Sequence, residues 1–148
     1  MKGYYLMKSN ILIIAGTGSI ITAVFQTVIS FSPSMSLYFG APKDLVEYNL
    51  LLIISGLLFS IVFLVFGLYG YSGGGLIMKL PFLRAGLFVI GIIYSLRGII
   101  LFKQLSVVLK IFPSEEIIAP QLFLTSFVSL LIGILYLSGS IKYREKLK

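Results

Sequence analysis

Long stretches without a charged residue dominate this sequence. They run from Ser9 to Pro42, from Tyr48 to Met78 and from Ile117 to Ile141. Each stretch exceeds the roughly 20 residues that an α-helix needs to cross the hydrocarbon core of a bilayer. Lipid offers no hydrogen-bond partner to an open backbone, so a crossing segment must be helical. The pattern therefore predicts at least three membrane-spanning helices.

A fourth span is predicted between Arg84 and Arg97, which bracket the apolar segment AGLFVIGIIYSL. With this segment included, the sequence predicts an all-α, integral membrane four-helix bundle. The whole chain, residues 1–148, is expected to form one domain. The expected helices lie at about 10–31, 47–71, 81–102 and 120–140. The first is expected to be retained rather than cleaved as a signal peptide, because it is about twice as long as a secretory h-region.

The basic residues support four spans and indicate an orientation. Four spans place the two terminal segments and the loop after the second helix on one side of the membrane, and this side has eight Lys and Arg residues. The opposite side has three. The positive-inside rule then predicts that both termini are cytoplasmic in a multi-pass protein of the inner membrane. With three spans, the C-terminal tail and its four cations would be placed outside. The eight are Lys2, Lys8, Lys79, Arg84, Lys142, Arg144, Lys146 and Lys148, and the three are Lys43, Lys103 and Lys110.

Breaker residues predict the connections. Loops are expected over 32–42, 72–75 and around Pro113, and the short middle loop predicts that the second and third helices are antiparallel neighbours. The helical periodicity of 102–112 predicts a connector that either lies along the outer interface or extends the third helix. Ser114 is expected to cap the fourth helix, with Glu115 and Glu116 in its first turn.

Composition narrows the function. The sequence is 58% hydrophobic and 11% charged, with a mean hydropathy of +1.06, which excludes an ordinary water-soluble globule. The net charge of +7 reflects cations at span ends rather than a surface for nucleic acid. The sequence has no Cys and no His, which excludes disulfides, thiolate or imidazole catalysis and ordinary zinc or haem sites. We therefore expect no cofactor, no metal and no enzymatic activity.

Small residues recur at helical spacing in all four predicted helices. Such stripes allow close helix approach in lipid and predict a compact bundle. A homo-oligomer, or an accessory or immunity-type subunit that docks a larger membrane protein through these faces, is the alternative. A transporter or channel subunit is a third possibility. The stripes comprise Ala15, Ser19, Ala23 and Thr27; Gly56 and Ser60; Gly91 and Ser95; and Thr125, Ser129 and Gly133.

A weak internal repeat relates the second and fourth helices at an offset of 66 residues. It matches Ser60, Val62, Gly67, Ser72 and Gly73 with Ser126, Val128, Gly133, Ser138 and Gly139. The first and third helices align poorly at this offset. Duplication of a two-helix unit is therefore a hypothesis. Tyrosines near span ends predict aromatic belts at the two interfaces, with Tyr69, Tyr71, Tyr136 and Tyr143 on the inner side.

Arg97 is the main candidate for a functional residue. Counting back from Phe102 at about 1.5 Å per residue places it roughly 7 to 8 Å inside the outer boundary. A charge at that depth is a functional candidate unless it snorkels to the headgroups. It could form a structural clasp with Glu47, or a pocket for a small anionic or lipid-like ligand. The polar groups expected near it are Glu47, Gln26, Tyr94, Gln121 and Asn49.

Three segments carry a resemblance: YFGAP at 38–42, LYGYSGGGLIMKLPFLRAGL at 68–87 and GIIYSLRGI at 91–99. They resemble a family of small four-span bacterial inner-membrane proteins that have an SG-x-G turn, an LP-x-LR segment and an IY-x-LRG segment. The resemblance implies the four-span topology and makes Arg84 and Arg97 family features. It implies no particular activity.

Overall fold

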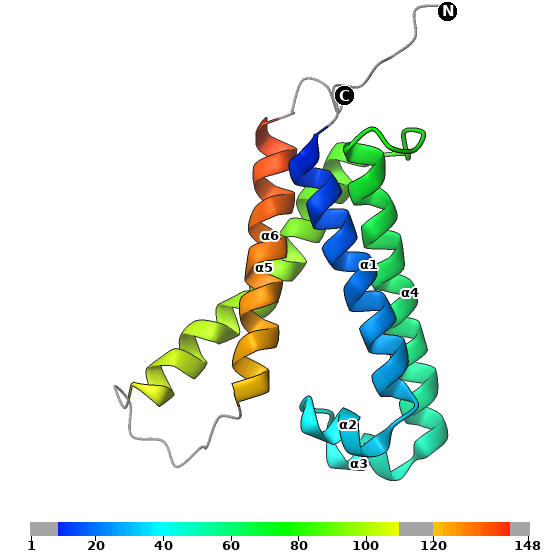
Figure 1. The fold of residues 1–148 in the computed structure, drawn as a ribbon, viewed down its shortest axis with the longest axis vertical. Helices are drawn as coiled ribbons and strands as arrows, with labels where there is room; N and C mark the ends of the chain where they lie inside the picture. The colour runs from blue at the N-terminus through cyan, green and yellow to red at the C-terminus, as the bar shows by residue number, and fades with distance from the viewer. Residues whose placement is uncertain (1–8, 110–119, 143–148) are drawn as a thin grey trace, which may run out of the picture.

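The computed structural model describes residues 9–109 and 120–142, which form four long and two short helices (Figure 1). All four long helices are long and apolar enough to cross a membrane, which confirms the four predicted spans. The long helices are α1 (Asn10–Ser30), α4 (Asn49–Gly73), α5 (Leu83–Val108) and α6 (Pro120–Lys142), and the short ones are α2 (Pro33–Tyr38) and α3 (Lys43–Glu47).

Two predictions about the connection after α1 were wrong. The segment expected as a loop contains α2 and α3, because Ser32 caps α2 by accepting from the Met35 N–H and Pro33 occupies the first turn. Glu47 therefore ends α3 instead of opening the second long helix, which begins at Asn49.

The segment after Phe102 extends the third long helix, since α5 continues to Val108. Of the two alternatives for this connector, the described part therefore fits the helix extension. The predicted cap at Ser114 and the acids Glu115 and Glu116 lie outside the described residues.

The long helices form two antiparallel pairs (Figure 1). α1 packs mainly against α4 and α5 against α6, while α1 with α6 and α4 with α5 join the pairs. The start of α1, the end of α6 and the turn between α4 and α5 share one end of the bundle, which we call the closed end. Toward the other end, where α2 and α3 lie, the two pairs diverge, and we call it the divergent end.

The second and third spans are antiparallel and in contact, as predicted, but each has another helix as its main neighbour. α4 and α5 do meet near their turn, where the Tyr69 hydroxyl donates to the Pro81 carbonyl at 3.2 Å. The main neighbour of α4 is α1, because glycines on both helices let their backbones approach closely. A Cβ added to Gly70 would lie 2.5 Å from the Cα of Gly16.

Hydroxyl groups extend the α1–α4 contact toward the divergent end. The Ser60 Oγ donates to the Ala23 carbonyl at 2.8 Å and lies 2.6 Å from the Thr27 hydroxyl. In lipid such bonds between helices add to the packing of small residues.

The α5–α6 contact is also made by glycine and serine. A Cβ added to Gly133 would lie 2.8 Å from the Ser95 nitrogen and 3.1 Å from the Gly91 oxygen. Small residues of the predicted stripes thus form contacts between helices of the same chain, as expected for a compact bundle. A partner that docked through Gly67 or Gly133 would have to displace a helix of the same chain.

The two helix pairs repeat the same burial pattern. At the offset of 66, Gly67 and Gly133 each lie at the crossing point of their pair. α1 and α5 correspond at an offset of 75 instead, where Gly16 matches Gly91 and Ser19 matches Tyr94. The offsets differ because the connections within the two pairs differ in length. The burial of the two pairs is similar at these offsets, although Ser72 is buried and Ser138 is exposed, and duplication of a two-helix unit stays a hypothesis. Buried positions that correspond include Leu12 and Leu87, Ala15 and Ile90, Ser60 and Ser126, and Gly73 and Gly139.

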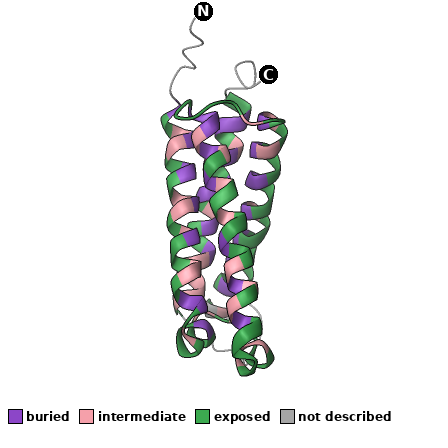
Figure 2. Ribbon diagram, turned by 90° about the vertical axis from the view of Figure 1, so that its right-hand side faces the viewer, coloured by how far each residue is buried: buried purple, intermediate pink, exposed green. Residues whose placement is uncertain are grey.

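The buried residues face one another inside the bundle, and exposed apolar side chains cover its outside (Figure 2). This distribution suits a protein surrounded by lipid. The buried hydrophobic cluster lies in the half of the bundle toward the closed end, on α1, α5 and α6. It comprises Leu12, Ala15, Leu83, Leu87, Ile90, Tyr94, Ile132 and Tyr136.

Candidate functional site

A chain of hydrogen bonds joins all four long helices. The Tyr94 hydroxyl donates to the Ser19 Oγ at 3.0 Å, and the Tyr136 hydroxyl donates to the Phe66 carbonyl at 2.7 Å. The Ser19 and Tyr136 oxygens lie 3.0 Å apart, and the Ser19 hydroxyl is left to donate to Tyr136. We call Ser19, Tyr94, Tyr136 and the Phe66 carbonyl the tyrosine–serine network.

Gly70 makes the network possible. A Cβ at this position would lie 2.9 Å from the Tyr136 hydroxyl oxygen, which must pass it to reach the Phe66 carbonyl. In the repeated unit Gly70 is the equivalent of Tyr136, and Ser19 is the equivalent of Tyr94. Two large side chains of the second pair thus fill the space that two small residues of the first pair leave.

Aromatic rings close the bundle around the network. The Tyr94 and Tyr136 rings stack with centroids 6.0 Å apart and an interplanar angle of 9°. Phe63 and Phe66 of α4 contact the Tyr94 ring at 6.0 and 5.9 Å. Tyr94 is 2% exposed and Tyr136 is fully buried. The expected place of Tyr136 in an interfacial belt was therefore wrong, because its phenol crosses the bundle interior to α4.

Arg97 lies one turn beyond Tyr94 on α5, and it is exposed. Since α5 continues to Val108, Arg97 is about 21 Å from the first residue of the helix and about 16 Å from the last, measured along the axis. The predicted distance of roughly 7 to 8 Å, which took Phe102 as the helix end, therefore underestimated the distance from Arg97 to the end of α5.

The polar cluster predicted around Arg97 does not assemble in the described residues. Glu47, the last residue of α3, and Asn49, the first residue of α4, are both exposed. The Gln121 amide donates to the Tyr38 carbonyl at 3.0 Å instead, and Gln26 is half-buried on α1. Within residues 9–109 and 120–142, no ion pair or hydrogen bond joins Arg97 to Glu47.

Two further polar atoms on the same half of α5 lack partners. The Ser95 Oγ and the Gln104 Oε1 are buried without a hydrogen bond. Buried polar atoms are normally paired, so each such atom in a native structure needs an explanation. Sequence reasoning missed Gln104, which lies four residues before the end of α5 but beyond the expected end of the helix at Phe102. It also missed the network, although hydroxyls deep within apolar runs require partners.

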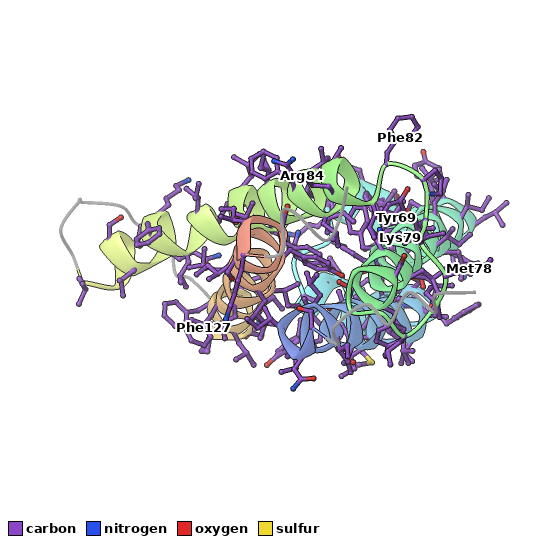
Figure 3. The ribbon with its side chains drawn as sticks, turned by 90° about the horizontal axis from the view of Figure 1, so that it is seen from above. Tyr69, Met78, Lys79, Phe82, Arg84 and Phe127 are labelled. Carbon is purple, nitrogen blue, oxygen red and sulfur yellow. The ribbon has the colours of Figure 1, made fainter. Side chains whose placement is uncertain are left out.

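The closed end carries cations beside exposed apolar side chains. Figure 3 shows Met78, Lys79 and Phe82 on the turn between α4 and α5, with Arg84 at the start of α5. Met78 and Phe82 are among the most exposed apolar residues of the described chain. Cationic and amphipathic residues at span ends are typical of a membrane interface.

These features define a small polytopic membrane protein with four transmembrane helices in a bundle. Comparison with protein-family models, with curated proteins and with solved structures finds no match for the chain.

Proposed function

We propose that this chain is a non-enzymatic protein of the inner membrane that binds an anionic lipid headgroup at Arg97. The exposure of Arg97 about midway along a membrane-spanning helix carries the proposal. Even on the lenient insertion scale, an unpaired arginine deep in a bilayer costs about 2.5 to 3.5 kcal/mol. A lipid phosphate offsets this cost, because a guanidinium donates two parallel hydrogen bonds to phosphate oxygens.

The compensating anion comes from outside the described chain. Its two acids are Asp44 and Glu47, both exposed on α3. α3 packs beside α4 and α2 at the divergent end, whereas Arg97 lies on α5, and none of the hydrogen bonds or ion pairs of the described residues joins it to either acid. Lipid phosphates are the anions present at the headgroup level of every membrane-spanning helix, and a long arginine side chain reaches them by snorkelling.

The proposal includes an orientation, with both termini cytoplasmic and the divergent end external, as the count of basic residues favours. The chain has no cysteine, so single-cysteine labelling in cells needs no background variant. We expect Asp44→Cys to react with a membrane-impermeant maleimide in intact cells, and Met78→Cys to react only after permeabilisation. Labelling of Met78→Cys in intact cells would contradict the orientation.

The role of Arg97 is tested by lipid retention. Native mass spectrometry of the purified protein with phosphatidylglycerol and phosphatidylcholine should show preferential retention of the anionic lipid. We expect Arg97→Gln to weaken phosphatidylglycerol binding about tenfold or more, which corresponds to a loss of about 1.4 kcal/mol or more. Arg97→Lys should keep part of the binding, because it keeps the charge but loses the bidentate geometry.

Arg84→Gln is the matched control, since it removes the same charge from the other end of α5 (Figure 3). It should leave the phosphatidylglycerol affinity unchanged. Inorganic phosphate is the second probe. Equal losses for Arg97→Gln and Arg84→Gln would refute a site at Arg97, and phosphate binding without lipid retention would assign the site to a free anion.

A further inference from the structure

Gln104 is a second unexplained polar residue in the half of α5 beyond Tyr94. It is 9% exposed, and its Oε1 has no hydrogen-bond partner. In the tyrosine–serine network, by contrast, every hydroxyl has a hydrogen-bond partner. A buried carbonyl oxygen without a donor keeps the full desolvation penalty of that group. Gln104 therefore carries an acceptor that a donor from outside the described chain would satisfy.

Gln104 and Arg97 share one face of α5. They are seven residues apart, which is almost two helical turns and about 10.5 Å along the axis. Leu101, between them, is buried like Gln104, whereas Arg97 is exposed. Gln104 lies closer to the divergent end, which the proposed orientation places at the external surface. A phosphate at Arg97 would therefore direct its headgroup along the helix toward Gln104.

We infer that the lipid bound at Arg97 has a hydroxyl-bearing headgroup, such as glycerol, and that Gln104 accepts a hydrogen bond from it. This inference rests on the proposed function. The terminal amide rotates to present its oxygen to the headgroup. A headgroup hydroxyl supplies the missing donor, whereas a headgroup capped by a methyl group leaves Oε1 unpaired. Gln104 is thus a specificity-determining residue, and Arg97 supplies the affinity for the phosphate.

The test compares two anionic lipids with the same charge. Phosphatidylglycerol carries headgroup hydroxyls, and phosphatidylmethanol carries none. Binding of each lipid to the purified full chain is measured by native mass spectrometry. We expect the natural protein to prefer phosphatidylglycerol about fivefold, the value of one hydrogen bond. Gln104→Leu should bind both lipids equally while keeping the affinity for phosphatidylmethanol. Gln104→Glu, which repels the phosphate, should weaken both.

The variants separate the two proposals. If Arg97→Gln leaves the binding of both lipids unchanged, the lipid site at Arg97 is wrong. If Arg97→Gln weakens both but Gln104→Leu still prefers phosphatidylglycerol fivefold, the site stands and the role of Gln104 is overturned. Thermal unfolding of Gln104→Leu serves as the folding control, because removal of an unpaired buried carbonyl should not lower stability.

Discussion

Gly133→Leu should lower the free energy of unfolding by about 3 kcal/mol, because the added side chain has no space at the α5–α6 crossing. Even a Cβ at this position would lie 2.8 Å from the Ser95 nitrogen, which is backbone and cannot move without α5. The Leu side chain must therefore push the two helices apart. The measurement is thermal or denaturant unfolding of the purified protein in one detergent.

Ser138→Leu is the control for this effect. Ser138 lies on the same helix and is exposed, with its hydroxyl bonded only to carbonyls of α6 itself. The substitution adds the same side chain to the lipid-facing surface, so we expect an unchanged or slightly higher stability. If both variants unfold alike, Gly133 does not face α5, and the pairing of α5 with α6 is wrong.

Tyr136→Ala is expected to lower stability by about 3 to 5 kcal/mol, the usual loss for a large buried aromatic residue. The change removes the ring stacked on Tyr94 and the hydroxyl that reaches α4. Tyr136→Phe keeps the ring and removes only the hydroxyl, which should lower stability by about 1 to 3 kcal/mol. The difference between the free energies of unfolding of Tyr136→Ala and Tyr136→Phe measures how much packing of the ring contributes to stability. The same unfolding assay serves for both variants.

Tyr38→Ala is the matched control, since Tyr38 is exposed on α2 and its contact with Gln121 uses the backbone carbonyl. Its stability should change little. A Tyr136→Phe variant as stable as the natural protein would mean that the network adds nothing to the bundle. In that case packing between the pairs, including the contacts of Phe63 and Phe66 with the Tyr94 ring, would hold the two helix pairs together.

The belt assignment of Tyr136 shows where local reasoning stopped. Its position near the end of an apolar run matched an interfacial tyrosine, and Tyr69 and Tyr71 share that pattern. The deciding fact was that Gly70 of another helix leaves room for the phenol. A contact across 66 residues of sequence depends on which helices pair, and hydropathy does not carry that information.

Arg97 shows a similar limit. Its charge within an apolar segment marked it as a candidate, but its partner was sought among residues of similar depth. Depth along a helix does not determine the direction of a side chain. Glu47 ends α3 and has no hydrogen bond or ion pair with Arg97 in the described residues, and α5 continues past Phe102.

The sequence by itself determined that this is a four-span, all-helical membrane protein, because lipid requires long apolar segments to be helices and their number can be counted along the chain. It also suggested, as a hypothesis, that Gly67 and Gly133 occupy equivalent positions of an internal repeat. Only the tertiary structure decided that α1 pairs with α4 and α5 with α6, and that Ser19, Tyr94 and Tyr136 meet between them. The physical reason is that apolar helices are equally soluble in lipid, so their pairing depends on the fit of particular small and large side chains.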